Sequence, residues 1–175
     1  MSLSIKSGAW SIPATSTTQQ VVTGAGFTPK LVIISSTFAT SDNSTSVSTN
    51  WAVGAATSAT ESFAFGARTT DAGSTRGMAA YDGSFLVGCN TTGAPPTMLA
   101  GFDAFTSDGF NFTPSTNGAG IIKLGWLAIG GTDISSVKVG TFSSGTTATT
   151  VSVACGFQPS IIILMAAGQR NTSGN

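Results

Sequence analysis

Histidine, the side chain that most often serves as a general base near neutral pH, is absent from all 175 residues. Its absence excludes the Ser-His-Asp and Cys-His arrangements of nucleophilic catalysis and the usual zinc ligands. The carboxylates stand singly, at Asp42, Glu61, Asp71, Asp82, Asp103, Asp108 and Asp133. A glycosidase pair formed in space by two distant carboxylates is the one enzymatic alternative. The sequence therefore predicts a protein that is not an enzyme and that has no catalytic, cofactor or metal site.

Aromatic side chains are the remaining candidates for ligand binding, because sugar rings stack on flat side chains. The chain has three Trp, one Tyr and eleven Phe residues. Most of them lie inside apolar runs, which predicts positions in the core. Trp51 and Tyr81 are the better exposed candidates, and we take them as candidate ligand-stacking residues for a glycan.

The low charge of the chain limits the partners that it is expected to bind. Only 8% of the residues are charged, the net charge is zero, and Ser and Thr together supply about three residues in ten. No basic stripe indicates nucleic-acid binding, and no amphipathic or long apolar segment indicates a membrane. The first residues lack the pattern of a signal peptide, so we expect synthesis in the cytoplasm. Two cysteines give no support for a disulfide, and we expect Cys89 and Cys155 to be free, buried thiols.

Short apolar segments bounded by Gly, Pro, Asn, Asp and Ser recur along the chain, and helical periodicity is nearly absent. The predicted strands are 19–23, 30–37, 50–56, 61–66, 76–81, 84–90, 97–106, 110–113, 120–129, 137–142, 149–155 and 160–166. Such spacing predicts an all-β fold, an antiparallel β-sandwich of the jelly-roll kind.

Two Asp-Gly pairs and one long apolar run refine this prediction. Asp82-Gly83 indicates a β-hairpin, since glycine accepts positive φ, and Asp108-Gly109 indicates a second turn. Residues 41–48 and 93–96 are predicted loops. The run 120–131 is apolar on both faces, which predicts a central strand that is covered on both sides or meets a partner subunit.

The most informative feature is an internal repeat at a distance of about 130 residues. The first copy contains, in order, Lys6–Trp10, a Ser/Thr run, Val21-Val22, Gly26-Phe27-Thr28-Pro29 and the apolar run 31–34. The second copy contains Lys138–Phe142, a Ser/Thr run, Val151 and Val153, Gly156-Phe157-Gln158-Pro159 and the apolar run 161–165. Gly26, Phe27, Pro29, Gly156, Phe157 and Pro159 thus form a repeated structural motif that marks entry into a strand.

The repeat predicts a sandwich domain over residues 1–136 and the opening strands of a second, incomplete copy over residues 137–175. Apolar strands of this kind are not expected to stand alone in water. Three arrangements satisfy them: the natural chain continues, the tail completes the sheet of its own domain, or the tail adds strands to a neighbouring subunit.

These motifs resemble a pattern found in virion proteins of tailed bacteriophages. Gly26–Ile34 is followed by Thr106–Phe112 and by Gly125–Gly131, as in the phage pattern Gly-Phe-x-Pro, Ser-Asp-Gly-Phe-Thr and an aromatic-led strand ending in Gly-Gly. The resemblance spans residues 19–131 and supplies no catalytic residue. It implies a structural component of the particle, such as a tail fibre, tail-tip or capsid decoration protein.

The expected function is therefore structural. Such a protein would act in the virion by self-association, with a trimer favoured, and by attachment to other virion proteins. The alternative is a receptor- or glycan-binding module at a fibre tip, which would recognise a host-surface glycan through Trp51 or Tyr81.

Overall fold

The structure is a computed structural model that describes residues 2–39, 49–69, 76–90, 95–118, 120–143 and 150–165. These residues contain ten β-strands and no helix, so the prediction of an all-β fold is confirmed. No helix in this part of the chain is long and apolar enough to cross a membrane. The predicted loop 41–48 and the first half of the predicted loop 93–96 lie outside the described residues.

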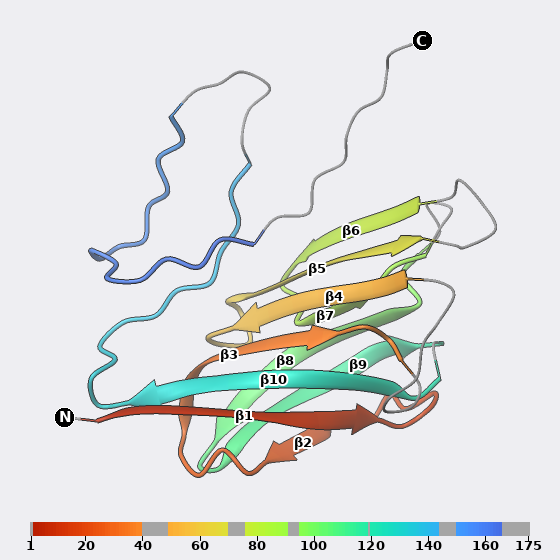
Figure 1. The fold of residues 1–175 in the computed structure, drawn as a ribbon, viewed down its shortest axis with the longest axis horizontal. Helices are drawn as coiled ribbons and strands as arrows, with labels where there is room; N and C mark the ends of the chain where they lie inside the picture. The colour runs from red at the N-terminus through yellow and green to blue at the C-terminus, as the bar shows by residue number, and fades with distance from the viewer. Residues whose placement is uncertain are drawn as a thin grey trace.

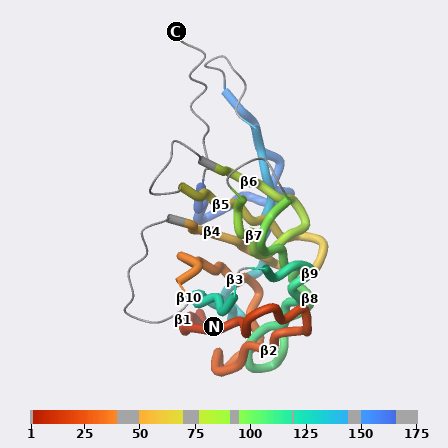
Figure 2. The backbone as a smooth tube through the Cα atoms, turned by 90° about the vertical axis from the view of Figure 1, so that its right-hand side faces the viewer, coloured from red at the N-terminus to blue at the C-terminus, as the bar shows by residue number. Residues whose placement is uncertain are grey.

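Two antiparallel sheets pack face to face, as the views in Figures 1 and 2 show, which confirms the predicted β-sandwich. The six-stranded sheet has the order β1 (Leu3–Ile12), β10 (Ile122–Gly131), β3 (Pro29–Ser36), β4 (Thr49–Ala56), β5 (Ser62–Thr69) and β6 (Arg76–Asp82). The four-stranded sheet has the order β2 (Gln20–Thr23), β9 (Gly109–Asn117), β8 (Met98–Thr106) and β7 (Leu86–Gly88).

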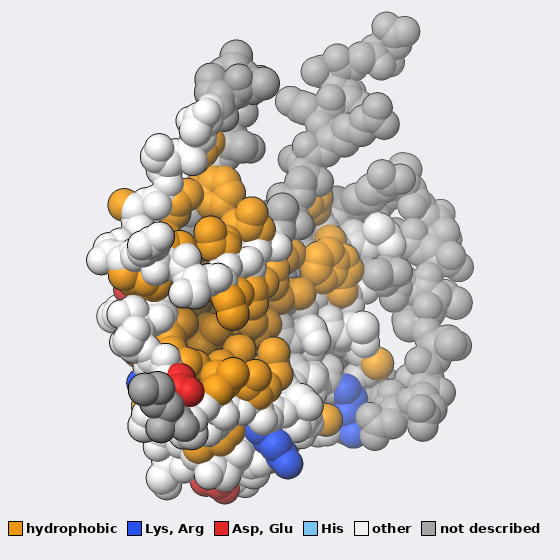
Figure 3. All heavy atoms as spheres, turned by 60° about the vertical axis from the view of Figure 1, so that its left-hand side comes forward, with side chains coloured by type: hydrophobic (Ala, Val, Ile, Leu, Met, Phe, Trp, Pro, Cys, Tyr) orange, Lys and Arg blue, Asp and Glu red, His pale blue; other side chains and the backbone are white. Residues whose placement is uncertain are grey.

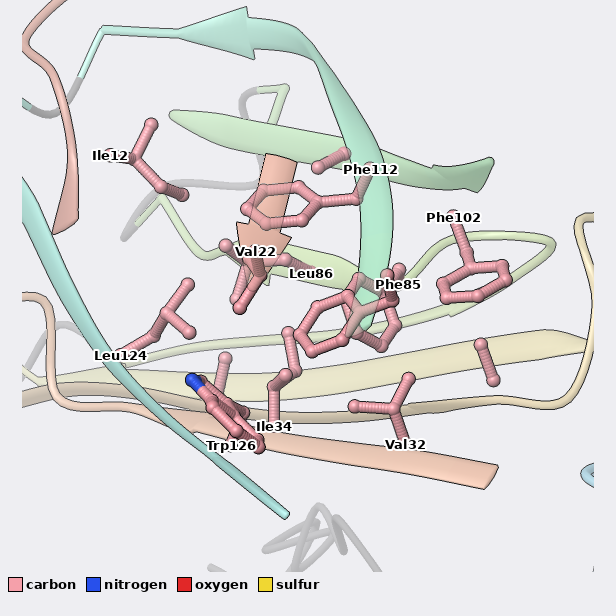
Figure 4. Close-up of a cluster of buried hydrophobic side chains, with 14 of the residues drawn as sticks. Ile12, Val22, Val32, Ile34, Phe85, Leu86, Phe102, Phe112, Leu124 and Trp126 are labelled. Carbon is pink, nitrogen blue, oxygen red and sulfur yellow. The ribbon is translucent and has the colours of Figure 1, made fainter. Parts of the chain in front are cut away.

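The core lies between the sheets and is built by side chains that alternate along each strand. In β10 every second residue from Ile122 to Gly130 is buried, and those between are half-buried. Phe85, just before β7, packs against Phe102, Phe110 and Phe112, with ring centroids 5.3 to 5.8 Å apart. Figure 4 shows this cluster between the sheets, next to Ile34 and Val22. Burial of these aromatic groups and of the aliphatic residues around them holds the sheets together.

β10 is the central strand that its apolar sequence predicts. It pairs with β1 on one edge and with β3 on the other. β1 is not among the predicted strands, because Ser, Gly and Lys interrupt its apolar residues. Its partner β10 nevertheless supplies the whole antiparallel ladder from Leu3 to Ile12.

The two predicted turns have different outcomes. Asp108-Gly109 does close a hairpin between β8 and β9, since Thr106 pairs with Gly109. Asp82-Gly83 does not close a hairpin, which corrects the prediction. Gly83 has the expected positive φ of 72°, but the chain there leaves β6 and crosses to β7 in the other sheet. An Asp-Gly pair fixes the local turn and not the sheet that receives the next strand.

The strands predicted over 137–142, 149–155 and 160–166 are wrong for the described residues. The chain at 132–143 and 150–165 forms no strand. In Figure 1 most of it lies outside the two sheets, and it is a strand of neither. A strand exists only as part of a ladder, so a strand-like sequence without a neighbour stays irregular.

Candidate interaction surfaces

The segment after β10 carries the most exposed apolar side chains of the described chain. The exposed fraction is 82% for Ile161, 67% for Ile162 and 72% for Leu164. Phe142, Val151 and Val153 are also exposed, between 39% and 52%. Keeping a run of five large apolar residues in water forgoes the free energy of burying them, which is about 1.5–3 kcal/mol for each side chain. We call the described residues of this segment, 137–143 and 150–165, the tail.

The repeated Gly-Phe-x-Pro motif has the same backbone turn in both copies. Gly26 has φ of 78° and Gly156 has φ of 80°, a region that favours glycine. In the first copy Pro29 is buried and begins β3, and the Phe27 ring lies against Gly130 of β10. In the second copy Phe157 and Pro159 are half-buried and Ile161 beyond them is exposed. The motif therefore sets the turn in both copies, but only the first copy continues into a strand.

A second apolar surface is the outer face of the six-stranded sheet. Two cross-strand rows supply most of it, and the strand registers define them: Ile5, Ile129 and Leu31, and then Leu127, Ile33 and Phe63, with the buried Ala55 between the last two. Ile5 is 57% exposed, as is Leu3 near the same edge. Figure 3 shows a broad hydrophobic area on the side where β1 begins and β10 ends, with charged side chains at its margin. Such patches mark interaction surfaces.

A groove of about 770 Å³ crosses this outer face near the other end of β10. Small residues form its floor, because Ala9, Gly125 and Ser35 follow one another in a single cross-strand row. Trp51 and Lys123 also line the groove. The groove thus combines an aromatic side chain, hydroxyl groups and a cation, which is a combination that suits a sugar or another polar ligand.

The two candidate stacking residues do not share a surface. Trp51 lies in β4 opposite Ala67, on the outer face, and its ring makes an edge contact with Phe65 at 5.6 Å. Tyr81 lies in the edge strand β6 opposite Ala64, on the face of the sheet that is turned towards the core. Both are half-buried. The groove is not visible in the sequence, because its floor depends on strand register.

Three of the dispersed carboxylates hold loops. Asp108 accepts hydrogen bonds from the backbone N–H groups of Gly24 and Gly26, at 3.1 and 2.6 Å. Asp103 accepts from the Gln19 side-chain amide and the Thr113 hydroxyl, at 2.8 and 2.7 Å. Glu61 accepts from the Thr57 hydroxyl at 2.7 Å. These contacts are structural, since they tie turns to neighbouring strands.

Both cysteines are free thiols, as predicted. Cys89 is buried, and burial raises the pKa of its thiol, although the backbone of Ala79 and the charge of Arg68 act in the opposite direction. Cys155, in the tail, is only half-buried, so the prediction of a buried thiol is confirmed for Cys89 and wrong for Cys155. A neutral, enclosed thiol is a poor nucleophile, so Cys89 behaves as a small apolar core residue.

Within the ranges that the structure describes, no three His, Cys, Asp or Glu residues gather into a metal-binding group. Comparison with known proteins finds no matching family model, no similar curated protein and no similar solved structure.

Proposed function

We propose that the chain is a non-enzymatic structural component of a bacteriophage particle, which acts by self-association and by attachment to other virion proteins. The exposed apolar tail carries this proposal. Ile161–Met165 lies in water beside a sandwich whose ten described strands are all paired. Such a segment gains the free energy of burial only when further polypeptide covers it. A segment with this requirement is expected in a protein that assembles with others.

The outer face of the six-stranded sheet supports the self-association half of the proposal. Its rows of Ile, Leu and Phe carry few charges, and only 8% of all residues are charged. Burying such a face against a neighbouring copy desolvates few ionic groups, so the cost of association is low. Identical subunits usually assemble with closed symmetry, and we expect a trimer, in which this face of one subunit contacts a different surface of the next.

The resemblance of the Gly26–Ile34 and Gly125–Gly131 segments to phage virion proteins supports the location. A tail fibre, a tail component and a capsid decoration protein all fit an all-β module that sits in repeated copies on a larger assembly. Mass spectrometry of gradient-purified particles from the phage that encodes the chain tests this. We expect the chain in multiple copies per particle; its absence from particles while it is abundant in the lysate would contradict the proposal.

Self-association is tested by sedimentation velocity over a range of concentrations. We expect the full chain to sediment as an oligomer. Ile5→Glu places a charge on the exposed edge of the outer face and is expected to shift the population towards monomer. Val21→Glu is the matched control, since Val21 is 47% exposed on the other sheet and should leave the oligomer intact. A monomer at every concentration would contradict the self-association half.

The groove beside Trp51 favours a second candidate function, the binding of a host-surface glycan. If the groove binds a glycan, Trp51→Ala removes the aromatic wall and should abolish binding on a glycan array. Tyr81→Ala is then the control that retains binding, because Tyr81 is on the opposite face of the sheet. An absence of binding by multivalent, oligomeric protein would eliminate this function.

A further inference from the structure

The tail repeats the sequence pattern of residues 6–34 but lacks the strands that surround that first copy. We propose that residues 137–143 and 150–165 belong to the first three strands of a second sandwich, and that these strands bind a partner made of strands equivalent to β4–β10. The partner must present a β10-like strand with a tryptophan and a glycine at the places of Trp126 and Gly130. The inference rests on the attachment role proposed above, and it specifies the kind of partner to which the tail attaches.

The first argument is the glycine opposite Trp126. In β1, Gly8 pairs with Trp126, and a Cβ on Gly8 would lie 2.4 Å from the indole ring. The indole therefore occupies the space that a side chain would fill, so this position requires glycine. The tail has Gly140 at the corresponding place in Lys138–Phe142, and a Cβ on Gly140 would meet nothing within 4 Å. Gly140 therefore meets the steric requirement that an indole ring would impose, although no indole ring lies beside it.

The second argument is the hydrogen bond that follows Gly8 in the first copy. The Trp10 indole N–H donates to the side-chain carbonyl of Gln20 at 3.4 Å, next to the core. The tail has Phe142 in place of Trp10 and Thr150 in place of Gln20. The donor and its amide acceptor are thus lost together, which avoids an unpaired buried group of the kind that costs about 1–3 kcal/mol.

The third argument is the strand that enters from the Gly-Phe-x-Pro turn. In β3, Val32 and Ile34 are buried in the core. Their counterparts, 130 positions later, are Ile162 and Leu164, which are apolar and able to fill a core. The turn that leads into them already has the same φ as in the first copy, within 2°. The backbone is therefore prepared for a β3-like strand.

The partner cannot be the described β10, because both edges of that strand are filled. β1 pairs with one edge and β3 with the other. An exchange of segments between copies leaves the same shortage of β10 strands. Each copy has one β10, but it has two sets of segments that fit beside a β10. In any assembly of residues 2–165 alone, one such set per chain remains without its β10. The partner strands therefore come from outside this range.

A chimera tests the inference: the chain through Met165 followed by a second copy of residues 36–131. Met165 corresponds to Ser35, so the junction keeps the register of β3. We expect the backbone amides of 161–165 to be protected from hydrogen exchange about 100-fold or more over those of the natural chain, as in other paired core strands. Unchanged exchange at 161–165 while 31–35 stay protected would overturn the proposal.

Two variants make the test specific to the register. In the chimera, Gly140→Val forces a side chain into the second indole and should remove the protection of 161–165. The same change in the natural chain should have no effect, because Gly140 has open space. Ser143→Val is the matched control at a counterpart of Ser11, which faces outward, and should retain the protection. Equal behaviour of the two variants would overturn the assignment. Both readouts come from single chains at low concentration, so they are independent of whether natural copies associate.

Discussion

At the scale of single residues, burial separates the two thiols. Cys89 is enclosed in the sandwich with a raised pKa, whereas Cys155 is half-buried in the tail. Because the thiolate is the reactive form, a thiol reagent at pH 8 should modify one cysteine per native chain and both after denaturation. Mass spectrometry of the labelled peptides checks the site, and Cys155→Ala should leave the native protein unlabelled. Rapid native labelling of Cys89 would contradict this.

The same shift makes a prediction for stability against pH. The ordinary pKa of a cysteine thiol is 9.0, and the folded value for Cys89 is higher. As the pH rises past 9.0, the unfolded chain loses this proton while the folded chain keeps it, so the free energy of unfolding falls. Below pH 9.0 the contribution is constant. Urea unfolding at pH 7 and pH 10 should show a smaller loss of stability for Cys89→Ala than for the natural chain; an equal loss would contradict the prediction.

Trp51 and Tyr81 show how far residue types alone could predict the candidate site. Their flanking sequence indicates surface positions, and both side chains are partly exposed. Which face each occupies depends on strand register, and a shift of one residue exchanges the two faces. The groove floor of Ala9, Gly125 and Ser35 has the same cause, since three distant small residues meet only in the correct register.

At the scale of elements, one carboxylate connects the entry to β3 with the β8–β9 hairpin. Asp108 accepts two backbone hydrogen bonds from the Gly24–Gly26 turn. Asp108→Ala leaves both N–H groups without this acceptor and should lower the free energy of unfolding by about 1–2 kcal/mol. Asp82→Ala is the control, because Asp82 is exposed and its change should stay within about 0.5 kcal/mol. Equal effects in urea unfolding would contradict the role given to Asp108.

Strand prediction from the sequence succeeds where the pattern and the neighbours agree. β3, β4, β8 and β10 combine apolar sequence with partners on each side or a hairpin, and the predicted bounds of each are close to the observed ones. β1 escapes prediction because Ser, Gly and Lys interrupt its apolar residues, although it pairs with β10 along its whole length. The tail is overpredicted for the converse reason, since Ile161–Met165 has the pattern of a strand and no neighbouring strand. The local sequence determines the strand propensity of a segment, but the fold determines which strand pairs with it.

At the scale of the whole molecule, we expect the sandwich to unfold as one cooperative unit, and the described residues of the tail contribute no side chain to its core cluster. All buried aromatic side chains of the core cluster come from residues 85–126, and none comes from the tail. The described strands occupy Leu3–Gly131, so the free energy of unfolding belongs to this range. A domain of this size has a net stability of about 5–15 kcal/mol, which makes single core contacts significant.

Two matched substitutions test this division of the molecule. Phe85→Ala removes a fully buried ring that contacts three other rings and should cost about 3–5 kcal/mol in urea unfolding. Phe142→Ala makes the same chemical change in the tail, where the ring is 50% exposed, and should leave the free energy of unfolding within about 0.5 kcal/mol of the natural chain. If Phe142→Ala were as destabilising as Phe85→Ala, the tail would belong to the core of this sandwich. Its apolar residues would then need no further partner, and the assembly role would lose its physical basis.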